Sequence, residues 1–442
     1  MASDLLSIAA SGARAARSAL DVTAQNIANA SSEGYVRRSV RLEEVSAAGG
    51  PGRQGDISLS GARVAGIVRN ADMFRQAEVR RTGSDLERAA TELRGLENIE
   101  SAVEQSGLFP SIVEFEASLL QLAADPTDPS LRAATLSAAD TLARKFNIAV
   151  ETLEAASEGL RFDAGAAVTE ANVIGGELAR VNLRLARAGA GSSDRASLLD
   201  QRDALLERMS GIVDISTSFA ADGAVTVNTG GVNLVSGGNY TAMALVTNPD
   251  GTIALGVGSA PPFTPAGGRI AGAALALASS ADVRIRLDNL ANSISGAVNT
   301  AQSQGTAVDG SPGQPMFSGT GAAQIRVAIS DSGMIATAPA GAPAGSLDGS
   351  NLAALRAAIT NAGVVTSANG LLFDVSSAVS GRRLTLEALD SIASSARIAL
   401  EQQAGVDLDT EAANLMRFQQ AFQASGRAMQ VASRIFDTLM EL

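Results

Sequence analysis

Apolar residues recur at alternating spacings of three and four along both ends of this chain. The pattern runs from about Ser3 to Ala28 and again from Gly405 to Leu442. Such spacing places apolar side chains on one face of a helix. At about 1.5 Å per residue the C-terminal helix would span roughly 50 Å, which is long for a terminal helix. The two faces predict termini that pair with each other or with neighbouring copies, or else pack on the body as core helices.

The composition allows a large core built from small side chains. The chain has 442 residues, of which 46% are hydrophobic, enough to bury the core of two or three domains. It contains no Trp and two Tyr, so much of the packing must use Ala, Val, Leu and Ile. Small side chains favour close contacts between helices.

Missing residue types exclude several classes of site. The chain has no Cys and no His, which removes disulfides, thiolate or imidazole metal sites and every Ser/His/Asp arrangement. Lys145 is not preceded by the Gly-rich loop that a phosphate site needs. We therefore expect no catalytic, cofactor-binding or metal-binding residues and no cofactor.

Charge and hydropathy limit the partners. The formal net charge is -12, and no basic cluster is long enough to neutralise a series of phosphates, so we expect no nucleic acid. No run of eighteen apolar residues occurs, and Asp4, Arg14 and Arg17 interrupt the N-terminal segment. We expect no membrane insertion and no Sec signal, so that secretion would need another export route.

The middle of the chain is mainly helical. Helical spacing covers residues 71–107, and Asp128 is placed to cap a long helix whose first residue is Pro129. A further helix to about Ala188 turns into Arg195–Met209, which predicts an antiparallel helical hairpin.

At Gly211 the apolar period changes from 3.6 to 2. Short β-branched runs separated by turns continue to about Val257, which predicts an inserted β domain. Helical spacing resumes near Ala281. The Gly, Pro and Ser content of 305–350 predicts irregular structure, with one possible strand at 324–329.

The remaining segments complete a mainly α fold with an inserted β domain. Extended sequence follows the first helix to about Val68, with alternation at 56–61, and a helix from about Leu384 to Gln403 precedes the last one, for which Asp409 is the expected N-cap. The predicted domains are terminal helices forming a coiled-coil-like inner domain at 1–35 and 405–442, a mainly helical body of long helices at 36–210 and 281–404, and an outer β-rich domain at 211–280.

One motif lies at the end of the first helix. Residues 25–35 read Gln-Asn-Ile-Ala-Asn-Ala-Ser-Ser-Glu-Gly-Tyr. This segment resembles the N-terminal signature of flagellar rod, hook and junction proteins, with Ser-Glu in place of the usual Thr-Pro before Gly-Tyr. The Val36-Arg37 that follows resembles the form typical of the first junction protein. Taken alone, Asn26 and Asn29 would cap the helix end and form the turn.

Two further segments carry a more specific resemblance. Residues 197–203 read Ser-Leu-Leu-Asp-Gln-Arg-Asp and precede a β-rich series at 213–237, while 405–424 and 436–439 fall in the last helix. All of them are similar to the FlgK family, the hook-associated proteins that form the first hook-filament junction. The resemblance covers most of the chain and is poorest around 39–70 and 310–380.

The acidic residues of the second segment have an interpretation of their own. In isolation Asp200 and Asp203 could form a catalytic or metal-binding cluster. On a helix, however, they share a face with each other and lie near Arg202 and Arg195. This spacing favours structural ion pairs.

The resemblance implies a structural role. In this family the terminal helices form the inner tube of the flagellar axis, a helical body surrounds them, and β-rich insertions face outward. It implies a ring of self-associating copies between the hook protein and the second hook-filament junction protein. It also implies synthesis in the cytoplasm, passage through the flagellar type III export apparatus with the help of an export chaperone, and a final place in the extracellular flagellum.

The same resemblance assigns residues to the assembly interface. We expect apolar side chains of the two terminal helices to meet in the assembled tube and the first motif to help form the interface. The C-terminal phenylalanines would also bind the chaperone, because an exposed apolar stripe needs cover before export. The interface residues are Leu5, Ile8, Leu20, Asn26, Ile27, Asn29, Gly34, Tyr35, Leu415, Phe418, Phe422, Met429, Phe436 and Leu439, and the chaperone-binding residues are Phe418, Phe422 and Phe436.

Other functions fit parts of the pattern. The nearest is another flagellar axial subunit, such as a hook or distal rod protein, and a flagellin fits less well. A secreted hydrolase using only carboxylates would need an acidic pair in a loop constellation, and none is recognisable. A soluble coiled-coil adhesin would use the inserted helix-β body as its contact surface.

Overall fold

The computed structural model describes residues 2–32, 34–45 and 61–440, and it divides into two compact units. Unit 1 comprises Met1–Ser84, Glu170–Ala242 and Asp390–Leu442, and unit 2 comprises Asp85–Thr169 and Met243–Leu389. The alternation predicted at 56–61 falls outside the described residues except for its last position.

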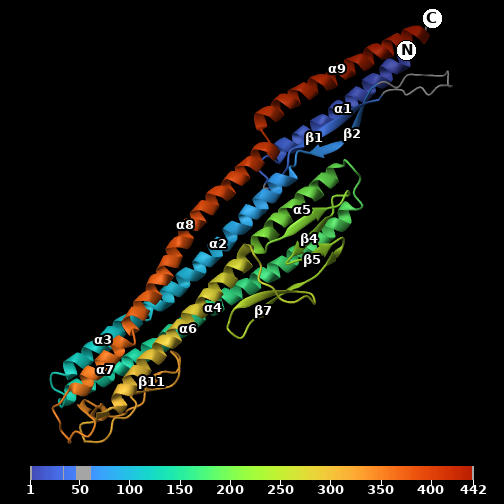
Figure 1. Ribbon diagram of the computed structural model, residues 1–442. Helices are drawn as coiled ribbons and strands as arrows, with labels where there is room; N and C mark the ends of the chain where they lie inside the picture. Colours follow the sequence, from blue (N-terminus) through green and yellow to red (C-terminus); the bar gives the residue numbers. More distant parts are fainter. Residues whose placement is uncertain (1, 33, 46–60, 441–442) are drawn as a thin grey trace. The chain divides into compact units, whose positions relative to one another are not determined.

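Figure 1 labels the helices and strands along the chain. The α-helices are α1 (Ala2–Ala28), α2 (Met73–Gln105), α3 (Leu108–Leu122), α4 (Pro129–Leu185), α5 (Ser193–Ile212), α6 (Gly268–Ser303), α7 (Ser350–Asn361), α8 (Val364–Ala404) and α9 (Leu408–Met440). The strands are β1 (Arg38–Val45), β2 (Gly61–Arg69), β3 (Ser216–Phe219), β4 (Val225–Thr229), β5 (Val232–Ser236), β6 (Asn239–Tyr240), β7 (Met243–Thr247), β8 (Ile253–Val257), β9 (Gly305–Thr306), β10 (Phe317–Ser318), β11 (Arg326–Val327) and β12 (Ala338–Pro339). The predicted class, mainly α with inserted β segments, is confirmed.

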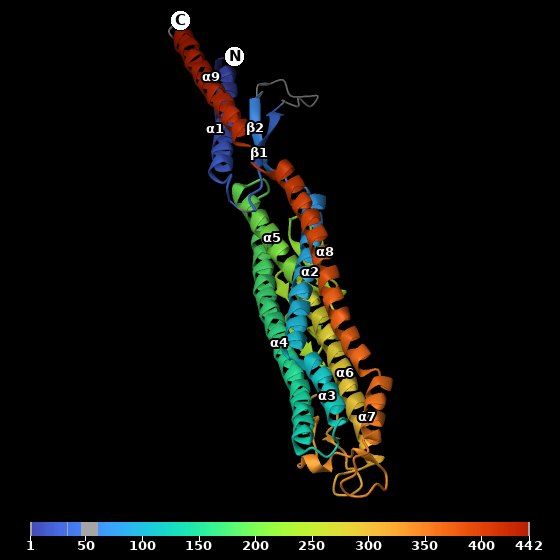
Figure 2. The same ribbon diagram turned by 90° about the vertical axis from the view of Figure 1, so that its left-hand side faces the viewer.

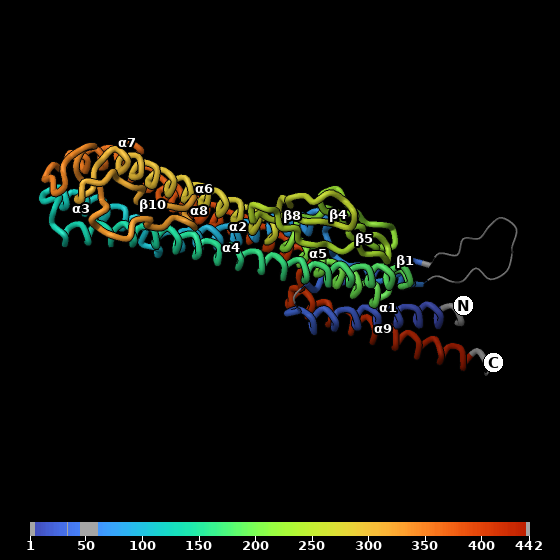
Figure 3. Tube along the Cα trace, turned by 90° about the horizontal axis from the view of Figure 1, so that it is seen from below, coloured from blue at the N-terminus to red at the C-terminus, as the bar shows by residue number. Residues whose placement is uncertain are grey.

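Unit 1 brings the two chain ends together. Helices α1 and α9 lie side by side with their free ends together, so they run antiparallel (Figures 1 and 3). The antiparallel hairpin of β1 and β2 packs against α1. At the turn between α4 and α5, the carbonyl oxygen of Gly191 accepts a hydrogen bond of 2.8 Å from the backbone nitrogen of Ile67. Strands β3 to β6 form a four-stranded antiparallel sheet in sequence order.

Unit 2 is a bundle of long helices around an apolar core (Figure 2). The rings of Phe115 and Phe317 meet edge to face with centroids 5.9 Å apart. The irregular segment between α6 and α7 is held by the buried side chain of Arg132 in α4, which donates to the carbonyl oxygens of Pro126 and Ile335 and to the hydroxyl of Thr337. Buried donors that find carbonyl partners can order a segment without regular secondary structure.

Several helix boundaries differ from the prediction. The two helices expected between Pro129 and Ala188 are one helix, α4, because single glycines in a packed helix cost only about 1 kcal/mol each and tertiary contacts override them. Helix α6 begins at Gly268 instead of Ala281, because its first turns bury alanines and so lack an amphipathic pattern. Helix α8 begins at Val364, earlier than the predicted Leu384.

The structure confirms the predicted N-cap of α4 and corrects that of α9. The carboxylate of Asp128 accepts hydrogen bonds from the backbone nitrogens of Ser130 and Leu131, as predicted. At α9 the cap is Asp407 and not Asp409, because Asp407 accepts from the backbone nitrogens of Asp409 and Thr410 at 2.9 and 3.0 Å. The inner, body and outer domains stay a prediction; by contacts, β3 to β6 belong to unit 1 and β7 and β8 to unit 2.

Small residues set the distance between α2 and α6 within unit 2. A methyl group added to Gly272 would overlap the carbonyl oxygen of Arg88 and lie 2.8 Å from the Cβ atom of Thr91. A methyl group added to Gly95 would overlap Ala276. The helices therefore approach so closely that only glycine fits at these points, as expected from the small side chains of the sequence.

Gly272→Ala should lower the free energy of unfolding by about 1–3 kcal/mol, because the backbone of α2 cannot move away without separating the helices. Denaturant unfolding followed by circular dichroism measures the effect. Gly296→Ala in the same helix is the matched control, since open space surrounds Gly296 and alanine should stabilise there by up to about 1 kcal/mol. Equal effects of the two substitutions would contradict close packing at Gly272.

Candidate functional site

Asn26 connects the end of α1 to two distant segments of unit 1. Its side chain is 1% exposed. The amide nitrogen donates to the carbonyl oxygen of Arg38 at 2.8 Å and to the Glu411 carboxylate at 3.2 Å. The amide oxygen accepts from the backbone nitrogen of Arg38 at 3.1 Å and from the hydroxyl of Tyr35 at 2.9 Å. These contacts use both donors and both acceptor positions of the amide.

Glu411 supplies the contact from the C-terminal helix. It lies in the first turn of α9 with its side chain 1% exposed, and its second carboxylate oxygen is 2.7 Å from Nε of Arg37. The backbone nitrogen of Arg37 also donates to the carbonyl oxygen of Ala404 at 2.9 Å. A buried carboxylate needs such partners to offset its loss of water. We call Asn26, Tyr35, Arg37, Arg38 and Glu411 the terminal network.

The terminal network continues through Arg38 into α5. The guanidinium group of Arg38 is 2.6 Å from the Asp200 carboxylate and also donates to the hydroxyl of Ser197 at 3.1 Å. Arg69 lies opposite Arg38 in the β1–β2 register and is 2.7 Å from Asp200 and 2.9 Å from Asp203. Two acidic residues of one helix thus bind the paired arginines at the open end of the hairpin.

Only part of this ion-pair arrangement was visible in the sequence. The interpretation of Asp200 and Asp203 as structural ion pairs is confirmed, and Arg202 does pair with Asp203 at 2.5 Å. Arg195 instead donates to the carbonyl oxygen of Ala221. The partners missed were Arg38 and Arg69, because nothing in the sequence indicates which strand faces the helix.

Burial is the largest influence on the pKa of Tyr35 and of two α5 side chains next to the terminal network, Asp200 and Arg202. It raises the pKa of the Asp200 carboxyl above its ordinary value, although Arg69 and Arg38 act in the opposite direction. Burial likewise raises the pKa of the Tyr35 hydroxyl and lowers that of the Arg202 guanidinium, which Asp203 partly offsets. The guanidinium of Arg38 also lies 4.9 Å from the centre of the Tyr35 ring, a cation–π distance.

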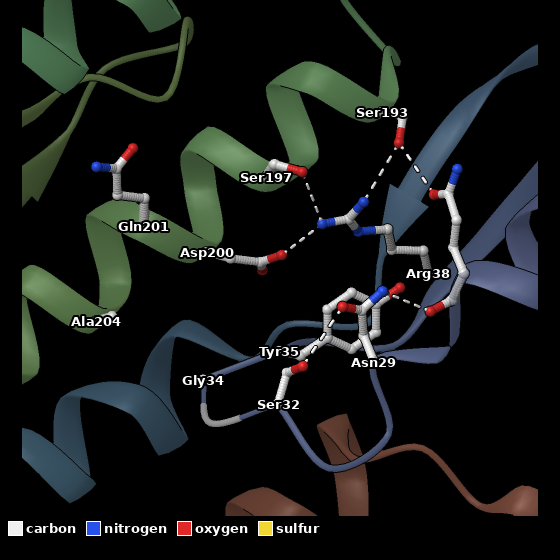
Figure 4. A pocket seen from close by; sticks show the side chains of 11 residues that line it. Asn29, Ser32, Gly34, Tyr35, Arg38, Ser193, Ser197, Asp200, Gln201 and Ala204 are labelled. Atoms are coloured by element: carbon white, nitrogen blue, oxygen red, sulfur yellow. Dashed lines mark hydrogen bonds and ion pairs between the residues drawn. The ribbon is translucent and has the colours of Figure 1, made fainter. Parts of the chain in front are cut away.

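A polar pocket of about 470 Å³ borders the network. Figure 4 shows Arg38 reaching between Ser193, Ser197 and Asp200 on one side, with Tyr35 and Asn29 on the other. The charged groups in this pocket already bind each other, so they hold the segments together and leave no acid and base poised for reaction. Within the described ranges, no group of three acidic side chains could hold a metal ion.

The first motif makes long-range contacts through Gln25 and Asn26, with Ser193 and Glu411 respectively, and several local contacts. Asn29 donates to the carbonyl oxygen of Gln25 at 2.8 Å, which is the local capping role expected from sequence. Gly34 has a φ of 74°, a left-handed conformation that favours glycine, and it lies exposed at the turn. Asn26 differs from both because all its partners are distant or lie across the turn.

The large apolar residues predicted to meet between the terminal helices are mostly not buried. Leu20, Leu415, Phe418 and Met429 are half-buried, and Leu5, Ile8, Ile27, Phe422 and Phe436 are exposed. The side chain of Leu439 lies outside the described residues. The buried apolar side chains of α1 are mainly alanines. The assignment of these residues to an interface between copies stays a prediction.

Three segments of the chain match flagellar families. The model "Flagellar hook-associated protein FlgK helical domain" matches residues 93–317, just over half of the chain. The model "Flagella basal body rod protein" matches 6–35, and "Flagellar basal body rod FlgEFG protein C-terminal" matches 400–442.

Curated relatives carry the same description. Flagellar hook-associated protein 1 of Bacillus subtilis is 25% identical over 483 residues, covering 96% of this chain and 95% of the relative. Its Salmonella typhimurium counterpart is 29% identical over 250 residues, covering 55% of this chain and 44% of the relative. A solved structure of the flagellar hook junction protein FlgK from Burkholderia pseudomallei is 23% identical with a TM-score of 0.49, covering 54% of this chain and 46% of that one.

Asn26→Ala should lower the free energy of unfolding by about 2–4 kcal/mol, because it leaves buried groups of Arg38 and Glu411 without a partner. Asn29→Ala, a change of the same residue type in the same motif, should cost less than about 1 kcal/mol because it removes local contacts at a half-buried position. Denaturant unfolding measures both, and hydrogen exchange of β1 localises the effect. Similar losses for the two variants would argue against Asn26 as the centre of the network.

Proposed function

The chain belongs to the family of the flagellar hook-associated protein FlgK, and from this premise we propose that it joins the flagellar hook to the filament as a ring of self-associating copies. Family membership makes it a structural, hook-associated protein of the bacterial flagellum and not an enzyme. The finer role, a junction ring needed for filament assembly, is the proposal.

One observation carries the proposal furthest. The two ends of the chain, each matched separately to a flagellar family, meet in unit 1 through the buried contacts of Asn26 and Glu411. An antiparallel pair of terminal helices is the element expected to line the inner tube of an axial structure. Along α9 apolar side chains remain exposed, among them Met416, Val431 and Ile435, and contacts with neighbouring copies would cover them.

The partners follow from a position in the axis. One side of the ring would contact the hook protein and the other the second hook-filament junction protein. The protein would be made in the cytoplasm, leave through the type III export apparatus and end in the extracellular flagellum. The predicted interface residues, from Leu5 on α1 to Phe436 on α9, are part of this proposal.

Membrane insertion is not part of the proposal. Between Ser350 and Thr438 the helices include one stretch long and apolar enough to cross a membrane by length and composition, with 28% of that stretch buried. The core helix of a protein that does not cross a membrane passes the same test, and Val364, Leu371 and Val375 of α8 lie in the apolar core of unit 2.

Deleting the gene should give cells with hooks but no filaments, because filament subunits would have no junction on which to assemble. Electron microscopy of the cells and an assay for filament protein in the medium test this outcome, and the plasmid-borne gene should restore filaments. Cells without hooks would identify a hook or distal rod subunit instead. Normal filaments would refute the junction role.

We further propose that an export chaperone binds α9 before secretion. Phe422 and Phe436 are 44% and 50% exposed in the free chain, and Phe418 is half-buried with Arg417 over its ring at 4.9 Å. A row of aromatic side chains on one helix is a surface that an apolar groove can bind.

Removing residues 409–442 should abolish binding of the purified flagellar export chaperone of the same organism, measured by calorimetry. Phe422→Ser with Phe436→Ser should weaken binding at least about tenfold, since each buried aromatic contributes more than about 1 kcal/mol at such surfaces. Phe74→Ser is the control, because Phe74 is even more exposed but lies on α2. Unchanged affinity after the truncation would show that the chaperone site lies elsewhere.

A further inference from the structure

From Ala9 to Ala19 the contact surface of α1 toward α9 consists mainly of small side chains. Gly12 lies against α9, since a Cβ atom placed on it would be 3.9 Å from the Cβ atom of Ser425. Ala9, Ala16 and Ala19 lie three, four and seven residues from Gly12, so they share its side of the helix, and all three are buried. Moving α9 by one turn along this surface would replace one small residue by another. Apolar packing alone therefore gives little preference for one register.

Glu411 on α9, in contrast, makes a contact that depends on the register of the two helices. Among the side chains of α9 described between 408 and 438, Glu411 and Ala432 are buried, and Glu411 alone is charged. Its carboxylate binds Arg37, which directly precedes β1, and Asn26, which lies in α1. A displacement by one turn, about 5.4 Å, would take the carboxylate out of reach of both. The carboxylate would then be buried without a partner, and the Asn26 amide nitrogen would lose one of its two acceptors.

The connection between α8 and α9 does not fix the register by itself. Three residues, 405–407, separate the last residue of α8 from the first of α9. Three extended residues can span about 10 Å, more than one helical turn. Some other contact must select the position of α9 on α1.

We infer that Glu411 is the positioning residue that sets the register of α9 on α1, through its contacts with Arg37 and Asn26. A single buried polar group can specify the register of a helical pair whose apolar contacts are permissive. This inference concerns one chain and holds whether or not copies assemble into a junction ring.

Engineered cysteine pairs test the register directly, because the chain has no cysteine of its own. Gly12→Cys with Ser425→Cys reports the observed register, since a Cβ separation of 3.9 Å suits a disulfide. Gly12→Cys with Met429→Cys reports a register displaced by one turn, because position 429 lies four residues, about 6 Å, further along α9. Oxidation of the dilute full-length monomer, read on non-reducing gels, gives the rate for each pair.

With Glu411 present, the first pair should form at least about ten times faster than the second. Glu411→Ala should reduce this preference about tenfold while the helix content measured by circular dichroism is kept. Glu411→Gln, which keeps the shape and one hydrogen-bond acceptor, should fall between the two. Asp409→Asn is the matched control, because it removes an exposed carboxylate from the same turn and should leave the preference unchanged.

Two outcomes would overturn the inference. The first is an unchanged preference in Glu411→Ala. The second is loss of both disulfides in Glu411→Ala and Glu411→Gln alike, because Glu411 would then hold the helices together without choosing their register. A change in Asp409→Asn as large as that in Glu411→Ala would count against the specific contacts in the same way.

Discussion

Two arginines placed opposite each other at the open end of a β-hairpin connect the hairpin, α5 and the end of α1 in unit 1. Arg38 and Arg69 are register partners, and like charges in directly opposed positions destabilise a strand pair. Asp200 binds both, so α5 offsets this repulsion and stabilises the hairpin in this register. The same strand residue, Arg38, bonds to Asn26 through its backbone. The hairpin, α5 and the terminal helices therefore stabilise one another.

Small side chains and buried polar groups have different effects in this chain. Glycine at Gly95 and Gly272 lets helices of unit 2 approach closely, and alanines do the same on α1. Such surfaces pack well but discriminate poorly between alternative alignments. Buried hydrogen bonds and ion pairs discriminate strongly, because a displaced group loses its partner while staying out of water. Small apolar side chains thus allow close packing of the helices, and buried polar contacts select one alignment of them.

What could be predicted from the sequence was decided by local interactions. The terminal helices, the α4–α5 hairpin and the Asp128 cap follow from periodicity and capping chemistry within a few residues. The early start of α6 was missed, because buried alanines give no amphipathic signal. The local role of Asn29, next to the terminal network, was visible in the sequence, whereas the partners of Asn26 and Asp200 lie up to 385 residues away. Only the three-dimensional structure brings those segments together.

The burial of side chains differs along the length of helix α9. Its first turn is held by Glu411, and the described remainder buries little besides Ala432. Exposed apolar side chains on a helix of this length would favour association, because burying apolar surface stabilises a complex by roughly 25 cal/mol per Å². The polar contact of Glu411 at one end can fix the position of the helix, while the apolar side chains along the rest of α9 remain exposed for contacts. The position of the helix and its exposed apolar surface then depend on different residues.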